Sequence, residues 1–85
     1  MTFCIAVFRS RTQVMEFIEY MQSRGIDGSA INTPAEARVG CGISAKFPKI
    51  YLNYAKEVVR RLSLTSLTGF YELKINGGRT SVRRI

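Results

Sequence analysis

The sequence contains no histidine and no tryptophan, and it has only two cysteines, Cys4 and Cys41. Without a histidine, the chain cannot form the Cys–His pair in which an imidazole is the general base of a protease or an acyltransferase. Two cysteines also fall short of the four nitrogen or sulfur ligands of a structural zinc ion. We therefore expect no metal ion and no cofactor. The thiol chemistry that remains is sulfur or selenium carriage, thiol–disulfide exchange or covalent tethering.

Long apolar runs are also missing. Met1 precedes an apolar stretch without the charged segment that opens a signal peptide. No run approaches the roughly 18 apolar residues of a membrane span. We expect the chain to be cytoplasmic, where thiols stay reduced.

Acidic residues are scarce, since 13 Lys and Arg stand against 6 Asp and Glu and give a net charge of +7. This charge raises nucleic acid and acidic proteins as candidate partners. The basic residues are spread over the ends of the first predicted helix, the second helix and the C-terminal tail, at Arg9, Arg11, Arg24, Lys56, Arg60, Arg61, Arg79, Arg83 and Arg84. Such a spread is typical of a solvated basic surface, so we expect any binding of nucleic acid to be weak.

Hydrophobic patterning predicts four strands and two helices. Ser10 and Gln13 form a capping box ahead of an apolar stripe at helical spacing, and Gly25 ends that helix. The predicted strands span residues 3–8, 29–32, 43–47 and 70–75, and the predicted helices span residues 11–24 and about 50–62. Asn76-Gly77 predicts a hairpin turn. Residues 77–85 then form either a basic tail or an extra edge strand.

The order β-α-β-β-α-β predicts an α+β fold of the ferredoxin-like, split βαβ type. We expect one domain over residues 1–76, because 85 residues are too few for two cores. Its sheet would have four strands, antiparallel or mixed, with both helices on one face. In this interpretation the first and third strands run parallel at the centre of the sheet. Cys4 and Cys41 then lie near the same end as candidate neighbours, although a cysteine in an apolar strand is more often a core residue.

The apolar first strand has two faces. If Phe3, Ile5 and Val7 face the helices, the open face of the sheet presents Cys4, Ala6 and Phe8. Such an apolar stripe more often marks a homodimer contact than a surface that stacks bases.

The segment Gly40-Cys41-Gly42 is the strongest candidate for chemistry. Both glycines leave the cysteine without bulky neighbours and can turn amide N–H groups, such as those of Gly42 and Ile43, toward the sulfur. Arg38 and Lys46 are close in sequence and would also favour a thiolate. The alternative is that the glycines make a tight turn and the cysteine fills a small gap. Spacing alone supports both interpretations equally.

A helix-start signal precedes this segment, with Thr33 as the N-cap, Pro34 at the first helical position and Glu36 at the third. Together with Cys41-Gly42 and the apolar run that follows, it resembles the core of the Se/S carrier protein-like family, a small bacterial family. The likeness extends over most of residues 3–75. The resemblance implies that Cys41 is a carrier thiol, with Gly42 and the Thr33-Pro34 turn as its scaffold, and that donor and acceptor proteins are its partners. A carrier rather than a true enzyme is the expectation.

The competing interpretation is a non-catalytic module that binds nucleic acid or protein, because four-stranded sheets of this topology often bind RNA on their open face. An RNA-recognition motif carries aromatic residues on its third strand. The third predicted strand here has only Ser44 and Lys46 in those places. The sequence therefore favours the carrier.

Overall fold

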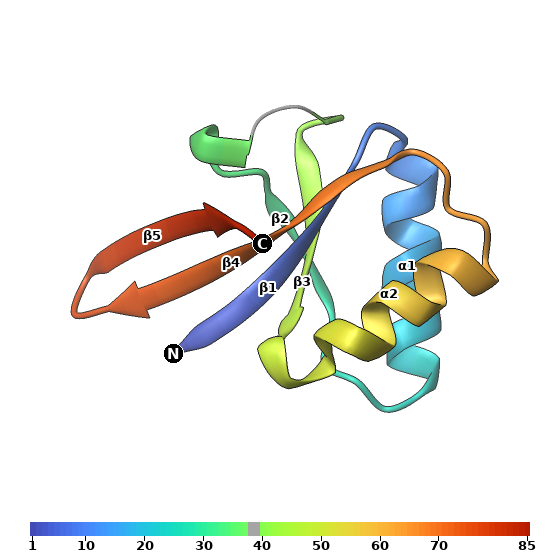
Figure 1. Cartoon of the computed structure of the whole chain (residues 1–85), viewed down its shortest axis with the longest axis horizontal. Coiled ribbons are helices and arrows are strands. Elements are labelled where there is room, and N and C mark those ends of the chain that lie inside the picture. Colours follow the sequence, from blue (N-terminus) through green and yellow to red (C-terminus); the bar gives the residue numbers. More distant parts are fainter. Residues whose placement is uncertain (38–39) are drawn as a thin grey trace.

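The computed structural model describes residues 1–37 and 40–85. Two α-helices cover one face of a five-stranded antiparallel sheet (Figure 1). The elements are β1 (Thr2–Phe8), α1 (Arg11–Ser23), β2 (Ser29–Asn32), the single-turn helix η1 (Ala35–Ala37), β3 (Ile43–Pro48), the single-turn helix η2 (Lys49–Tyr51), α2 (Leu52–Arg61), β4 (Leu67–Asn76) and β5 (Arg79–Arg84). The strand order is β2-β3-β1-β4-β5. The α+β class is confirmed, but the sheet has five strands rather than four, because residues 79–84 pair with β4.

Both ends of α1 follow from local sequence. The Ser10 side chain accepts a hydrogen bond from the amide of Gln13, which satisfies one of the free N–H groups of the first turn. At the other end Gly25 has a φ of 77°, and the amide of Ile26 donates to the carbonyl of Met21. This is a Schellman motif, and its positive φ favours glycine at position 25. No helix in the described part of the chain is long and apolar enough to cross a membrane.

The two central strands run in opposite directions, so the prediction of a parallel central pair is wrong. Cys4 lies opposite Phe47, and Val7 lies opposite Ser44. The reason is that α1 connects β1 to β2, which run in the same direction, and β3 pairs between them antiparallel to both. Reversal places Cys4 and the start of β3 at opposite ends of β1. Cys4 and Cys41 are therefore not neighbours.

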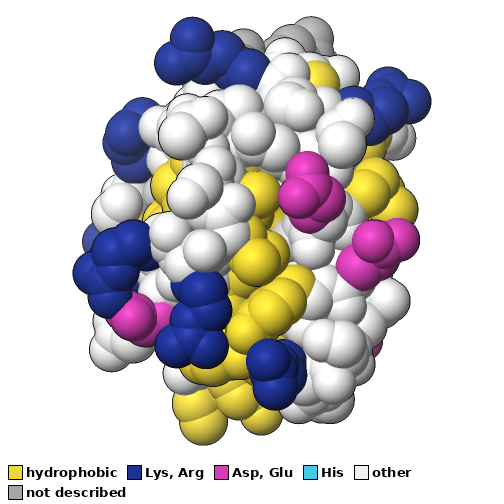
Figure 2. All heavy atoms as spheres, turned by 90° about the vertical axis from the view of Figure 1, so that its right-hand side faces the viewer, with side chains coloured by type: hydrophobic (Ala, Val, Ile, Leu, Met, Phe, Trp, Pro, Cys, Tyr) yellow, Lys and Arg dark blue, Asp and Glu magenta, His cyan; other side chains and the backbone are white. Residues whose placement is uncertain are grey.

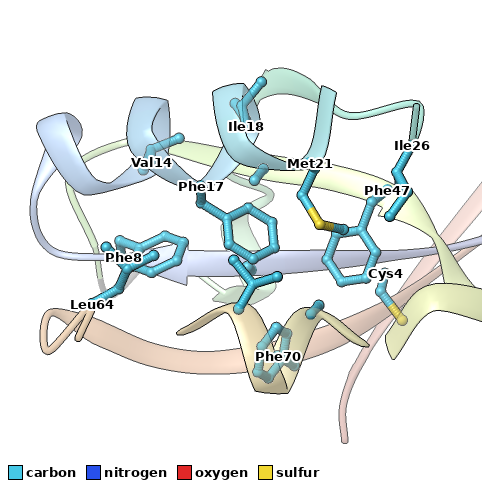
Figure 3. Close-up of a cluster of buried hydrophobic side chains, with 14 residues drawn as sticks. Cys4, Phe8, Val14, Phe17, Ile18, Met21, Ile26, Phe47, Leu64 and Phe70 are labelled. Atoms are coloured by element: carbon cyan, nitrogen blue, oxygen red, sulfur yellow. The ribbon is translucent and has the colours of Figure 1, made fainter. Parts of the chain in front are cut away.

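The larger core lies between the sheet and the helices, and β1 contributes Cys4, Ala6 and Phe8 to it. Phe17 of α1 packs between the rings of Phe8 and Phe47, with ring centroids 5.7 Å from each (Figure 3). The expectation that these three β1 residues form an open face is wrong. Because β1 is apolar on both sides, its alternation could not indicate which side meets the helices.

The opposite face of the sheet holds a second, smaller core. Ile5 and Val7 are fully buried there, together with Tyr71 and Leu73 of β4. Ala37 of η1 is also fully buried in this cluster, and β5 lies against η1. The fifth strand and η1 thus close the face that was expected to be open. This packing fixes η1, and with it the start of the segment that leads to Cys41.

Candidate functional site

Cys41 lies in the loop that enters β3, at the Phe8 end of β1. Its amide donates a hydrogen bond of 3.1 Å to the carbonyl of Phe8. Its side chain is half-buried against the core between sheet and helices, and it is a free thiol. The sulfur has the carbonyl oxygen of Ile43 as its hydrogen-bond acceptor, at 3.7 Å. The predicted cradle of N–H groups at Gly42 and Ile43 thus gives way to a carbonyl contact in this conformation.

The two flanking glycines have different physical roles. A Cβ on Gly40 would lie 2.4 Å from the carbonyl oxygen of Phe8 and 3.0 Å from a methyl carbon of Val7. No side chain fits there, so Gly40 lets the loop pack against the end of β1. Gly42 has a φ of 96° with open space around it, which is a backbone requirement rather than a packing one.

The Thr33-Pro34 turn holds the loop from the β2 side. The amide of Thr33 donates to the carbonyl of Gly42 at 2.9 Å, and the amide of Ala37 donates to the carbonyl of Pro34. The buried hydroxyl groups of Thr33 and Ser44 lie 2.6 Å apart and share a hydrogen bond. The Thr33 hydroxyl, expected to cap a helix, thus joins the turn to β3. Glu36 is exposed on η1.

The basic residues named from the sequence have different places. Arg38 lies outside the described residues. Lys46 lies on the opposite side of β3 from the helices, with its ammonium group 4.5 Å from the centre of the Phe3 ring, so the structure does not bring it to Cys41. Arg9 follows Phe8, whose carbonyl accepts the hydrogen bond from the Cys41 amide, and Arg9 is exposed. The sequence did not predict that the segment around Phe8 and Arg9 lies next to the loop, because only the Phe8–Cys41 hydrogen bond brings the two together.

Cys4 occupies the opposite kind of environment. It is fully buried, with 0% of its surface exposed, at one end of the core (Figure 3). Burial raises the pKa of its thiol, while the nearby Lys49 lowers it to a smaller extent. A thiol that is buried and protonated is a poor nucleophile. Along β1 it lies four residues from Phe8, or roughly 13 Å at the rise of a strand.

A buried carboxylate lies near Cys4 and has no counterpart among the predicted site residues. Glu72 is 3% exposed and pairs with Lys49 of η2, with Arg83 of β5 at 3.2 Å and with Lys74 at 3.8 Å. The hydrogen bond from Lys49 lowers the pKa of Glu72, against the effect of burial. The signal in the sequence that could have indicated this cluster is Glu72 itself, an acidic residue within an otherwise largely apolar strand. The cluster ties three elements together at the end of the sheet away from Cys41.

The comparisons with known proteins bear on this geometry. Residues 3–71 match the family described as "Putative Se/S carrier protein-like". The chain belongs to this family. No curated protein and no solved structure matches it.

The family match includes the loop of Cys41 but ends before Glu72, the acidic residue of the charged cluster. Both cysteines, the Thr33-Pro34 turn and Gly42 lie within the residues shared with the Se/S carrier-like family, whereas Glu72 and β5 lie beyond them. In residues 1–37 and 40–85, no three Cys, Asp or Glu side chains come together as metal ligands would. The chemistry that the site offers is that of one half-buried thiol at the end of a sheet.

Proposed function

We propose that this member of the Se/S carrier-like family carries sulfur or selenium on Cys41. The observation that supports the proposal most is the position of Cys41. Its thiol is half-buried on a loop held at both sides, by the Phe8 carbonyl and by Thr33, while the other thiol of the chain is sealed in the core. The domain that holds it would be a ferredoxin-like, split βαβ fold with β5 as an added edge strand.

The transfer is written as follows for sulfur. The Cys41 thiolate attacks the terminal sulfur of a donor persulfide, R–S–SH. The S–S bond of the donor breaks, Cys41–S–SH forms, and the donor leaves as the thiolate R–S⁻. Delivery is the reverse reaction, in which a nucleophile of an acceptor protein takes the terminal sulfur and Cys41 leaves as a thiolate. No electrons are gained or lost, and selenium would travel in the same way as Cys41–S–SeH.

Such a carrier needs no general base, because the transfer requires only a thiol that the donor can reach. The half-buried position of Cys41 on its loop supports that access. The donor and the acceptor are other proteins, and the reducing cytoplasm is the compartment in which a free thiol of this kind persists.

The experiment that tests the proposal compares wild type, Cys4→Ser and Cys41→Ser after incubation with a cysteine desulfurase and cysteine. Intact mass should rise by one sulfur atom in wild type and in Cys4→Ser, and the gain should disappear on reduction. Cys41→Ser should gain nothing. A sulfur adduct that persists in Cys41→Ser, or that is lost in Cys4→Ser, would contradict the assignment.

The second candidate is a non-catalytic module that binds nucleic acid or protein, which the net charge of +7 favours. Its binding to RNA should fall steeply with salt. Tight, sequence-selective binding at physiological salt, combined with no sulfur on Cys41, would establish it in place of the carrier.

A further inference from the structure

The side of the molecule formed by the helices exposes an apolar strip. Figure 2 looks onto this side, where hydrophobic side chains run down the middle, Lys and Arg side chains lie along the left, lower and upper margins, and Asp and Glu side chains lie mainly to the right. Ile50 is 85% exposed, and Tyr51 and Tyr54 are 37% and 36% exposed. The opposite face of the sheet is different, because Ile5, Val7, Tyr71 and Leu73 are buried there.

Two arginines lie at the ends of the packed helices, Arg24 directly after α1 and Arg61 at the end of α2. The guanidinium of Arg24 donates a hydrogen bond of 3.0 Å to the hydroxyl of Tyr20 and lies 4.9 Å from the centre of its ring. That hydrogen bond is the main reason why the pKa of Tyr20 is lowered, and the Arg61 and Tyr54 side chains contribute less. The contact between Tyr20 and Arg24 lies on α1, which packs against α2, and α2 exposes Tyr54 and Arg61. We call the surface formed by Tyr20, Arg24, Ile50, Tyr51, Tyr54 and Arg61 the helix seam.

The arginines of the helix seam are not neutralised within the described residues. The ion pairs in residues 1–37 and 40–85 join Glu72 to Lys49, Lys74 and Arg83, and Glu57 to Arg60. Arg24 and Arg61 have no carboxylate partner among them. Exposed tyrosine and arginine beside an apolar side chain make the combination that is enriched at protein interfaces.

We propose that the helix seam is the docking surface for an acidic segment of a partner protein. Carboxylates of that segment pair with the guanidinium groups of Arg24 and Arg61, whose planar N–H groups match a carboxylate. An apolar side chain of the same segment packs on Ile50 and Tyr51. The proposal does not depend on whether Cys41 carries sulfur.

Charge and chemistry favour this occupant over two others. A second copy of the chain would bring a net charge of +7 and the same two arginines to the contact, which repel. Nucleic acid would leave the aliphatic side chain of Ile50 without a matching surface, because it binds through phosphates and stacked bases.

The test uses a defined probe, the peptide acetyl-Asp-Glu-Leu-Glu-Asp-Phe-Asp-Glu-Leu-amide, titrated into the whole ¹⁵N-labelled chain. Amide shifts should change around Tyr20, Tyr51 and Tyr54, and a peptide with Lys in place of every acid should cause no change. The double variant Arg24→Glu/Arg61→Glu should weaken binding by at least about tenfold. The matched control Arg79→Glu, on β5, should bind as wild type does.

Three results would overturn the proposal. They are shift changes away from the helix seam, equal binding of the Lys peptide, and unchanged binding by the double variant when its amide spectrum shows a folded chain. Displacement of the peptide by oligouridine with tighter binding would assign the seam to nucleic acid. A dimer in sedimentation that the double variant abolishes would assign it to a second copy.

Discussion

Cys4 and Cys41 lie near opposite ends of β1, and they differ in burial and in the groups that surround the sulfur. Cys4 near the start of β1 is fully buried opposite Phe47, and burial raises the pKa of its thiol. Cys41 is joined through its amide to Phe8 at the other end of β1, and its thiol is half-buried in a loop between two glycines. The same side chain is thus a core-filling group at one end of β1 and a candidate carrier at the other. What decides between these roles is the packing around the sulfur, which residue type alone does not determine.

The largest expected effect comes from opening the core beside Cys4. Phe47→Ala should lower the free energy of unfolding by about 3–5 kcal/mol, because a fully buried ring that packs on Phe17 and Phe70 is replaced by a cavity. Urea denaturation measures the loss. Phe3→Ala is the control, since Phe3 is only partly buried and should cost less. A loss below about 1 kcal/mol for Phe47→Ala would show that Cys4 is not in a tightly packed core.

A smaller effect is expected at the Cys41 end. Gly40→Ala should cost about 1–3 kcal/mol and loosen the hydrogen bond between Cys41 and Phe8, because the new Cβ collides with the Phe8 carbonyl. Faster hydrogen exchange at the Cys41 amide would report the loosening. Gly28→Ala is the matched control, since its Cβ would make only ordinary contacts of 3.7 Å and 3.9 Å. Equal stability of the two variants would mean that Gly40 does not hold the loop.

The smallest effect concerns the charged cluster near Cys4. The pKa of Glu72 is lowered in the folded chain, so its ion pairs stabilise the fold fully above the unfolded pKa, about 4.3 for a glutamate, and are lost as pH falls through the folded pKa. The difference in unfolding free energy between wild type and Glu72→Gln should therefore be constant near neutral pH and shrink in acid. Urea denaturation across this pH range measures it. If the unfolding free energies of wild type and Glu72→Gln changed with pH in parallel, the lowered pKa of Glu72 would be contradicted. Glu19→Gln is the control, because Glu19 is exposed on α1.

Local patterns predicted much of the fold. The capping residue Ser10 and the stop at Gly25 placed α1 almost to the residue, and the alternation after Gly42 placed β3. These signals are local, because they depend on the backbone and on neighbours within a few residues. The family was also predicted from the segment around Thr33-Pro34 and Cys41-Gly42, and the match over residues 3–71 confirms it.

The features that the sequence did not predict depend on partners far apart in the chain. The direction of β3 relative to β1 follows from pairing, and the side of β1 that meets the helices could not be predicted from a strand that is apolar throughout. The pairing of Glu72 with Lys49 joins residues 23 positions apart. At the candidate site, the turn residues Thr33 and Gly42 do meet, whereas Lys46 belongs with Phe3. The assignment of Cys41 as carrier stays a prediction.

The contrast between Cys4 and Cys41 is tested most directly by the rate at which each cysteine of the native chain reacts with iodoacetamide at neutral pH. Mass spectrometry of the two cysteine-containing peptides measures both rates. Cys4 reacts only when the core opens, and an opening that costs about 3 kcal/mol already slows it on the order of 100-fold. We predict that Cys41 is alkylated faster than Cys4 by at least about that factor. Equal rates for the two thiols, or faster alkylation of Cys4, would contradict the account.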